Sequence, residues 1–275
     1  EEHDKCFRFT ITTNGVLLND ENIEYINREM SNAVLSIDGR KEVNDDLRPT
    51  VNGKGSYDVI VPKFQKLIEG RGTKDYYLRG TFTRFHQDFA EDVKALASIG
   101  RNISVEPVVG KEDDPYALQE ADLPALKAEY ERLAEYLRDH PETNFFHFNV
   151  DLAQGPCVIK RLRGCGAGCE YVAITPEGDI YPCHQFVGNE DYKLGSLYDG
   201  TFDKELSGRF AGLNIYTREE CKDCWARFYC SGGCSASNLL VNGDIKKPHR
   251  VGCELERKRL ECAIALRAIA AGMAE

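Results

Sequence analysis

The segment CKDCWARFYCSGGC, residues 221–234, carries four cysteines in the spacing C-x2-C-x5-C-x3-C, within a chain of 275 residues that has eleven cysteines in all. The first residues, EEHDKCFRF, lack the basic start and apolar run of a secretory signal. Without such a signal, thiols at such short intervals indicate metal ligation more strongly than disulfides. We therefore interpret this segment as part of a metal centre, with disulfide bonding as the alternative.

Zinc and iron–sulfur clusters are the two metal centres that these thiols favour. A structural zinc site usually combines two C-x2-C-like pairs, and only Cys221 and Cys224 form such a pair here. Iron–sulfur clusters accept irregular spacing from several loops, and a [4Fe–4S] cluster takes about four cysteines. The eight cysteines between residues 165 and 253 are therefore enough for two clusters. They are Cys165, Cys169, Cys183, Cys221, Cys224, Cys230, Cys234 and Cys253.

The residues around the thiols also favour iron–sulfur clusters over a zinc-bearing scaffold. Backbone that wraps a bulky cluster and points amides at its sulfurs needs residues with a permissive φ. Glycines flank the thiols at Gly164, Gly166, Gly168, Gly178, Gly232, Gly233 and Gly252. The segment EYVAITPEGDIYPC, residues 170–183, predicts a β-hairpin around Pro176-Glu177-Gly178 that would deliver Cys183 from a strand end.

Up to about residue 110 the chain alternates between strand and helix patterns, which predicts βα units and a parallel sheet. The predicted strands cover 7–11, 33–37, 76–83 and 103–109, with a further strand at 144–149. The predicted helices cover 20–30, 57–69, 89–97 and 123–138, and a final helix covers 253–273. The first of these helices has Asn19 or Asp20 as its predicted N-cap.

Polar residues follow the predicted strands at the edge where parallel sheets bind their ligands. They are Thr12, Thr13, Asn14, Ser36, Asp38, Thr83, Arg84 and Glu106. Asn14-Gly15 and Asp38-Gly39 are also ordinary turn formers. It is the repetition of polar residues at successive strand ends that favours a binding site there.

The composition excludes several other classes of protein. The chain is 42% hydrophobic and 29% charged, which is typical of a globular protein with a sizeable core. No apolar run is long enough for a membrane span, and a net charge of −10 argues against a nucleic-acid-binding surface. After about residue 150 the sequence changes to glycine, cysteine and short turns. This change predicts a boundary between a domain at 1–150 and a second at 151–275.

The cysteine pattern resembles the SPASM domain of radical S-adenosylmethionine (SAM) enzymes. The resemblance covers Cys165-x12-Gly178-x4-Cys183, Cys221-x2-Cys224-x5-Cys230-x3-Cys234 and then Cys253. TTNG (12–15), SIDG (36–39) and Asn44-Asp45-x-x-Arg48-Pro49, with Gly53 and Gly55 downstream, resemble strand ends and loops of the radical SAM barrel. The segment CVIKRLRGCGAGCEYVAITPEGDIYPCHQFVG (157–188) is similar to maturases of six-cysteine (SCIFF) peptides, which form thioether crosslinks from a Cys sulfur in ribosomal precursor peptides.

The resemblance implies an α/β fold: the C-terminal part of a partial (β/α)6 radical SAM barrel with a linking helix, followed by a small Cys-rich SPASM domain with a β-hairpin and helices. It also implies two auxiliary [4Fe–4S] clusters. The first cluster would take Cys165, Cys183 and Cys234, with Cys169 as an open choice for the fourth ligand. The second cluster would take Cys221, Cys224, Cys230 and Cys253. Ser36 and Asp38 would lie at the SAM site, and Arg79 is a candidate for the SAM carboxylate, with a plain ion pair as its alternative role.

One departure from the family pattern limits these expectations. Radical SAM enzymes bind their catalytic cluster through C-x3-C-x2-C, and the only cysteine before residue 157 is Cys6. We therefore expect the chain to be the C-terminal two-thirds or so of a maturase, with barrel strands three onward, and to be inactive toward SAM alone. SAM and a third [4Fe–4S] cluster would belong to the full-length enzyme, and no catalytic residue is assigned.

The implied partners are a Cys-rich precursor peptide and an external electron donor, in the cytoplasm. A non-catalytic iron–sulfur module that binds peptide or passes electrons is the alternative from another class. Cys157 and Cys262 have no place in the pattern and are predicted to be small buried hydrophobic residues. His184, directly after Cys183, is predicted to be exposed or to support the neighbouring ligand.

Overall fold

The computed structural model describes residues 5–150 and 162–272, and these fall into two compact units. The first unit holds the described parts of Glu1–Val108, Pro124–Asn149 and Ala265–Glu275, and the second holds those of Val109–Leu123 and Val150–Ile264. The units interleave along the chain, so the predicted division at residue 150 into two named domains stays a prediction.

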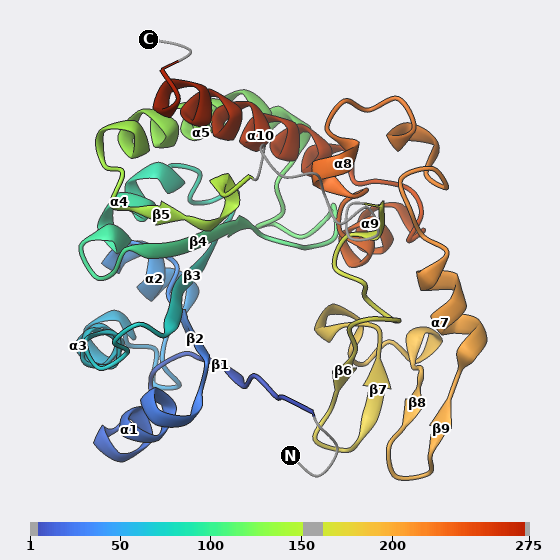
Figure 1. Cartoon of the computed structure of the whole chain (residues 1–275), viewed down its shortest axis with the longest axis horizontal. Coiled ribbons are helices and arrows are strands. Elements are labelled where there is room, and N and C mark those ends of the chain that lie inside the picture. The colour runs from blue at the N-terminus through green and yellow to red at the C-terminus, as the bar shows by residue number, and fades with distance from the viewer. Residues whose placement is uncertain (1–4, 151–161, 273–275) are drawn as a thin grey trace. The chain divides into compact units, whose positions relative to one another are not determined.

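The first unit contains a five-stranded sheet in which every paired strand is parallel (Figure 1). The strands follow the order of the chain: β1 (Thr10–Thr13), β2 (Asn32–Ser36), β3 (Asp75–Phe82), β4 (Asn102–Pro107) and β5 (Asn144–Phe145). The helices between them are α1 (Asp20–Glu29), α2 (Lys41–Leu47), α3 (Tyr57–Glu69), α4 (Phe89–Ala97) and α5 (Leu123–Asp139). The predicted alternation of strands and helices is therefore confirmed.

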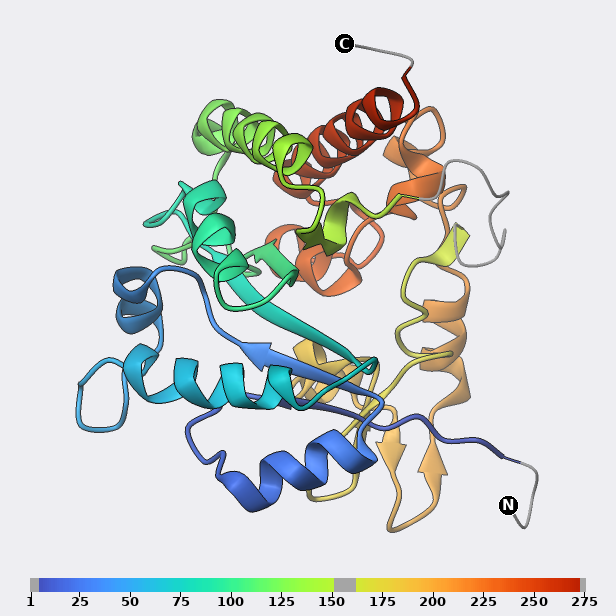
Figure 2. The same ribbon diagram turned by 60° about the vertical axis from the view of Figure 1, so that its left-hand side comes forward.

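One face of this sheet forms the core of the first unit. Alternate residues of β3 are buried, since strand side chains point to opposite faces with a period of two. The Phe82 ring at the end of β3 stacks on Phe89 of α4 with centroids 4.4 Å apart, and Tyr130 of α5 lies 4.7 Å from Phe89. Helices α1, α3 and α4 lie on the same side of the strands (Figure 2). The other face therefore keeps its polar side chains partly exposed.

Several predicted boundaries were wrong. The first strand begins at Thr10 rather than at residue 7, and Phe7 and Phe9 are exposed. The predicted strand at 144–149 is only the short β5, because Phe146–Phe148 turn into a 3₁₀ helix. One predicted boundary is confirmed. Asn19 is the N-cap residue of α1, and its side chain forms a reciprocal capping box with Asn22.

The second unit combines a small antiparallel sheet with short helices. Its strands are β6 (Ala173–Ile174), β7 (Asp179–Tyr181), β8 (Gly195–Ser196) and β9 (Thr201–Phe202). Its helices are α7 (Lys204–Ala211), α8 (Arg227–Cys230), α9 (Ser235–Asn242) and the part of α10 (Arg250–Ala270) up to residue 264. The predicted hairpin is confirmed, since β6 pairs with β7 through a turn that contains Gly178 at φ +84°.

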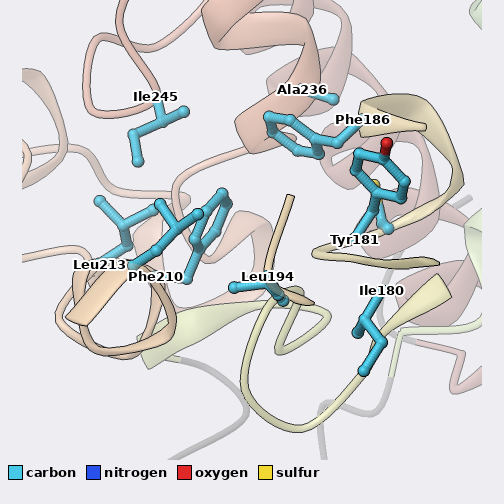
Figure 3. Packing of buried hydrophobic residues seen from close by; sticks show 10 residues of the cluster. Ile180, Tyr181, Phe186, Leu194, Phe210, Leu213, Ala236 and Ile245 are labelled. Atoms are coloured by element: carbon cyan, nitrogen blue, oxygen red, sulfur yellow. The ribbon is translucent and has the colours of Figure 1, made fainter. Parts of the chain in front are cut away.

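A compact hydrophobic cluster supports this second unit (Figure 3). Phe186 and Phe210 meet edge to face with centroids 5.4 Å apart, and Leu194 beside them is fully buried. Cys183 belongs to the same cluster. The hairpin that carries Cys183 is therefore anchored by packing as well as by strand pairing. Within residues 5–150 and 162–272, no helix is both long and apolar enough to cross a membrane.

Candidate iron–sulfur centres

Two of the predicted ligands in the second unit, Cys165 and Cys234, lie within electrostatic reach of a third, Cys183. Cys183 follows β7 after Pro182 and is buried, Cys165 is exposed in the turn before the hairpin, and Cys234 is the exposed N-cap residue of α9. Burial raises the pKa of the Cys183 thiol, and the neighbouring Cys234 and Cys165 thiols raise it further. These residues correspond to three of the ligands predicted for the first cluster.

Four other predicted ligands form a second set. Burial raises the pKa of Cys221, with further contributions from Cys230 and Cys224. Burial also raises the pKa of Cys253 to about 11, and the Cys221 and Cys224 thiols add to this shift. Cys230 responds to Cys253 and Cys224 in the same way, after the effect of its own burial. The assignment of these thiols to two clusters, with Cys234 apart from its neighbours in sequence, stays a prediction that these contacts support.

Backbone amides point at the sulfur of one thiol in each set. The amides of Gln185 and Phe186 donate to Cys183, and those of Gly232 and Gly233 donate to Cys230. Each contact lowers the thiol pKa, because a hydrogen bond to the sulfur favours the thiolate. Amides directed at ligand sulfurs are a feature of iron–sulfur sites, where they tune the bound cluster.

The turn after Cys230 takes an unusual backbone conformation to supply these amides. Ser231, Gly232 and Gly233 all have positive φ, at 58°, 87° and 73°. Glycine adopts this region without penalty, whereas Ser231 is the one described non-glycine residue in it, and such residues cluster at functional sites. The predicted role for Gly232 and Gly233 in wrapping the backbone around a metal centre is consistent with this geometry.

The donor chemistry of the two sets fits iron–sulfur clusters. Every cysteine that the structure describes is a free thiol, so the disulfide alternative has no support in those residues. Within the described ranges, no three His, Cys, Asp or Glu side chains converge closely enough to hold a single metal ion. Thiolate sulfur is the usual ligand of iron–sulfur clusters, so the residue type fits them. Because the buried thiols have raised pKa values, binding of metal would release protons.

Cys169 stands apart from both sets. It is exposed, its Sγ donates to the carbonyl of Gly166 at 3.4 Å, and it is not among the thiols that shift the pKa of Cys183. This contact of its sulfur is therefore local, within the loop that also carries Cys165 four residues before Cys169. Its role as fourth ligand stays a prediction.

We predict that Cys169→Ala removes iron from the first cluster or alters its electron paramagnetic resonance (EPR) signal. The loop between Cys165 and Cys169 contains Gly166 and Gly168, both with positive φ, and loading with iron can close it onto one cluster. The measurement is iron content and the EPR spectrum after anaerobic reconstitution, with Cys262→Ala as a matched control outside both sets. Unchanged iron content and spectrum in Cys169→Ala would show that one iron of the first cluster is open to an incoming thiol.

The sequence analysis also made predictions for three residues that are not assigned as ligands. Cys262 is buried, as predicted, and Cys157 lies outside the described residues. His184 is exposed, which agrees with one of its two predicted roles.

Two of the three predicted SAM-site residues lie side by side on the first unit's sheet. Ser36 at the end of β2 pairs in register with Arg79 of β3, and Arg79 pairs in turn with Ser104 of β4. The Arg79 guanidinium is half-exposed and lies 3.1 Å from a carboxylate oxygen of Glu106. The predicted alternative for Arg79, a plain ion pair, is therefore present, and the guanidinium remains accessible to a ligand.

Asp38 is placed differently from Ser36. Its carboxylate is buried and accepts two hydrogen bonds from Arg48, at 2.5 and 3.1 Å, and one from the Thr81 amide at 2.8 Å. Both carboxylate oxygens are thus engaged within the protein, and Asp38 ties the loop after β2 to β3. A direct contact between Asp38 and SAM stays a prediction.

Other predicted strand-end residues act locally. The Asn14 side chain accepts a hydrogen bond from the Val16 amide at 3.2 Å, and Thr83 accepts one from the Phe85 amide at 3.3 Å. These contacts support the turn-forming interpretation.

The sequence analysis missed His147, whose Nε2 lies 3.1 Å from the Ser104 hydroxyl and 3.7 Å from Glu106. Only the pairing of β5 with β4 brings it there, so the sequence carries no local signal for it.

Comparison with known proteins agrees with the geometry of the second unit. Residues 165–225 match the model of the SPASM family, described as an iron–sulfur cluster-binding domain. Mycofactocin maturase MftC of Mycolicibacterium smegmatis is 27% identical over 249 residues, which cover 86% of this chain and 61% of that protein. The cysteine-type anaerobic sulfatase-maturating enzyme of Clostridium novyi is 25% identical over 250 residues, which cover 82% of this chain and 63% of that protein.

A solved structure shows the same fold. The structure of anSMEcpe with bound AdoMet and the Cp18Cys peptide matches 99% of this chain and 78% of that chain, with a TM-score of 0.74 and 17% identity. This likeness confirms the predicted fold class. The chain spans 61% and 63% of the length of the two relatives above, so their activities extend to it only as proposals.

Proposed function

We propose that this chain, which carries a SPASM domain and is related to radical SAM maturases, is the auxiliary-cluster portion of an enzyme that modifies a ribosomal precursor peptide. The observation that supports the proposal is the electrostatic influence of the thiols on one another within two groups, with backbone amides that donate to Cys183 in the first group and to Cys230 in the second. This division supports two auxiliary [4Fe–4S] clusters rather than one metal centre.

In this proposal Cys165, Cys183 and Cys234 hold the first cluster, with Cys169 as its fourth ligand or with one iron open. The second cluster is held by Cys221, Cys224, Cys230 and Cys253. When bound, the clusters supply a binding site for a substrate thiol and an acceptor for an electron. Packing in the hydrophobic cluster holds the Cys183 sulfur in place before metal arrives, whereas the turn after Cys230 takes its final form with the metal.

The reaction that we propose for the full-length enzyme is formation of a thioether crosslink in a Cys-rich peptide. A 5′-deoxyadenosyl radical formed by one-electron reduction of SAM takes a hydrogen atom from a peptide carbon. The cysteine thiol loses its proton, the carbon–sulfur bond forms, and one electron leaves the peptide. We propose further that the full-length enzyme carries a third cluster, receives electrons from an external donor and acts in the cytoplasm.

The first unit supports a place for SAM in that enzyme. Ser36 ends β2 and pairs in register with Arg79, which lies within β3 and has an exposed side chain on the polar face of the sheet. An accessible guanidinium suits the carboxylate of an amino-acid group. These residues would orient the methionine part of SAM, whereas the buried Asp38 would support the loop beside them.

We expect anaerobic reconstitution to give about eight iron and eight sulfide per chain, because two [4Fe–4S] clusters hold about four of each. Iron and sulfide analysis makes the measurement. Stoichiometric zinc without sulfide would refute the cluster proposal in favour of a zinc scaffold.

The same preparation tests whether the chain acts alone. The chain has no C-x3-C-x2-C motif, so we expect no 5′-deoxyadenosine from SAM under reducing conditions. Formation of 5′-deoxyadenosine above a cluster-free background would contradict the expectation that this chain does not cleave SAM by itself. A chain that holds both clusters but does not support peptide modification when a radical SAM catalytic domain is supplied would favour the non-catalytic module.

A further inference from the structure

A buried arginine lies among the thiols of both sets. Arg218 is only 3% exposed. Its Nη1 donates to the carbonyl of Gly232, and its Nη2 donates to the Ser235 hydroxyl at 3.1 Å. Its Nε is buried without a hydrogen-bond partner. No carboxylate among the described residues comes within ion-pair distance of its guanidinium, so Arg218 is a buried cation without a conventional counter-ion.

Such an arrangement is costly unless a negative charge completes it. Removing an unpaired ion from water carries a penalty of about several kcal/mol, and burial accordingly lowers the Arg218 pKa. The ionisable groups that act in the opposite direction are all thiols. They are Cys221, Cys230, Cys234 and Cys253. Three of them belong to the second set and Cys234 to the first, and the guanidinium contacts Gly232 and Ser235 on either side of Cys234.

The chain also fixes the guanidinium in this position. Arg218 is the N-cap residue of the 3₁₀ helix Glu219–Cys221, which ties it to one ligand segment. Its contacts with Gly232 and Ser235 tie it to the residues on either side of Cys234. A Cβ at Gly232 would lie 3.0 Å from the Arg218 side chain, which shows how closely the guanidinium approaches this turn.

We propose that Arg218 is the buried counter-ion shared by the two auxiliary clusters, and that its charge raises their reduction potentials, most strongly that of the second cluster. This inference rests on the proposed two-cluster assignment. Thiolate-bound clusters carry net negative charge, and net charge, hydrogen bonding and burial set their potentials. A fixed positive charge stabilises the reduced, more negative state, because it offsets the added electron.

Nearby cations differ from Arg218 in ways that provide controls. Lys222 follows Cys221 directly, but it is exposed and pairs with Glu219 at 2.5 Å. Arg257, which lowers the Cys253 pKa, pairs with Glu254 at 2.5 Å. An exposed or paired charge is largely offset by solvent or by its partner. We therefore expect these cations to have less influence on cluster potential than Arg218.

The test compares Arg218→Gln, Arg218→Lys and Lys222→Gln with the unchanged chain, all reconstituted anaerobically. Glutamine keeps a hydrogen-bond donor and removes the charge, lysine keeps the charge, and Lys222→Gln removes an exposed charge beside a ligand. Iron and sulfide contents are measured first. EPR-monitored redox titration then gives the midpoint potential of each cluster.

We expect Arg218→Gln to disfavour reduction of the second cluster by at least about tenfold, the effect of one charge about 12 Å away at an effective dielectric constant of about 20. Tenfold corresponds to about 59 mV for a one-electron couple. The first cluster should shift less, in the same direction. Arg218→Lys should retain most of the potential, and Lys222→Gln should leave both clusters unchanged.

Each outcome separates this inference from the cluster assignment. If the unchanged chain fails to hold two clusters, the proposed function fails and this inference fails with it. If Arg218→Gln holds both clusters at unchanged potentials, only the counter-ion role is wrong. If Arg218→Gln loses iron that Arg218→Lys retains, the charge is required and the inference stands. Equal loss of iron in both variants would show that guanidinium hydrogen bonds, not charge, organise the site, and would overturn it.

Discussion

Removing iron from the reconstituted protein will open the segment from Arg218 to Cys234 while the hydrophobic cluster of Figure 3 stays folded. This segment is made of a 3₁₀ turn, the four-residue helix α8 and the strained turn after Cys230. Its fully buried apolar content is little more than Ala226 and the Cys221 thiol. Metal binding therefore supplies much of its folding energy, as in other small metal-dependent folds.

Amide hydrogen exchange followed by mass spectrometry, under anaerobic conditions with and without chelator, measures this effect. We expect peptides from residues 218–234 to exchange at least about a hundredfold faster without iron, which is a loss of about 3 kcal/mol of local stability. Peptides around Phe186 and Phe210 should keep most of their protection, because those rings pack against each other without metal. Peptides from α3 in the first unit serve as the internal control.

Two other results would contradict this expectation. Equal protection of residues 218–234 with and without chelator would mean that the segment folds without metal, and that its thiols are not held by a cluster. Complete loss of protection across the second unit would mean that the cluster of Phe186, Leu194 and Phe210 does not stabilise the unit by itself. A local effect is the outcome that the burial pattern supports.

The parallel sheet could be predicted because its signal is local. Each long strand of the first unit reads as a short apolar run ended by polar turn residues, and each predicted helix has a clear apolar stripe. The short helix α2, KEVNDDL, escaped prediction because seven mostly polar residues carry no readable period. The strand expected at 144–149 ended early because the aromatic residues Phe146 and Phe148 enter a 3₁₀ turn instead of continuing the pairing with β4.

The sequence indicated which cysteines belong to the candidate site. It did not indicate the tertiary contacts that other residues make around them. Spacing and composition identified the thiols, but only the family resemblance implied that Cys234 joins Cys165 and Cys183. The Arg218 side chain could not be recognised from sequence, because its contacts with Gly232 and Ser235 reach across more than a dozen residues of irregular backbone. The hydrogen bonds that occupy the Asp38 carboxylate are likewise tertiary contacts, so its burial had no local signal.

Replacing Arg71 with methionine will lower the free energy of unfolding of the first unit by about 3–5 kcal/mol, the cost of leaving several buried polar groups unpaired. Arg71 is 3% exposed and follows α3. Its guanidinium donates to the carbonyls of Ile26, Met30, Ser31 and Asp75 at 2.7–3.2 Å. It thereby joins the end of α1 to the starts of β2 and β3.

This role differs from that of the polar residues at the opposite ends of the same strands. In parallel α/β sheets the carboxyl ends carry ligand sites and the amino ends carry stability. Arg71 lies at the amino ends, and Ser36 and Arg79 lie toward the carboxyl ends. Arg71→Met should therefore destabilise the first unit without changing the iron content of the second, whose thiols depend on separate packing.

Urea unfolding followed by exchange of first-unit amides measures the loss, and iron analysis of the same sample measures the second unit. Lys74→Met is the matched control, since Lys74 also donates to carbonyls near the end of α1, at 2.8 Å to Asn27 and 2.6 Å to Arg28, but is less buried. We expect it to cost about 1 kcal/mol. If Arg71→Met costs no more than Lys74→Met, the carbonyls around Arg71 find other donors or water. The amino ends of β2 and β3 would then be held by strand pairing alone.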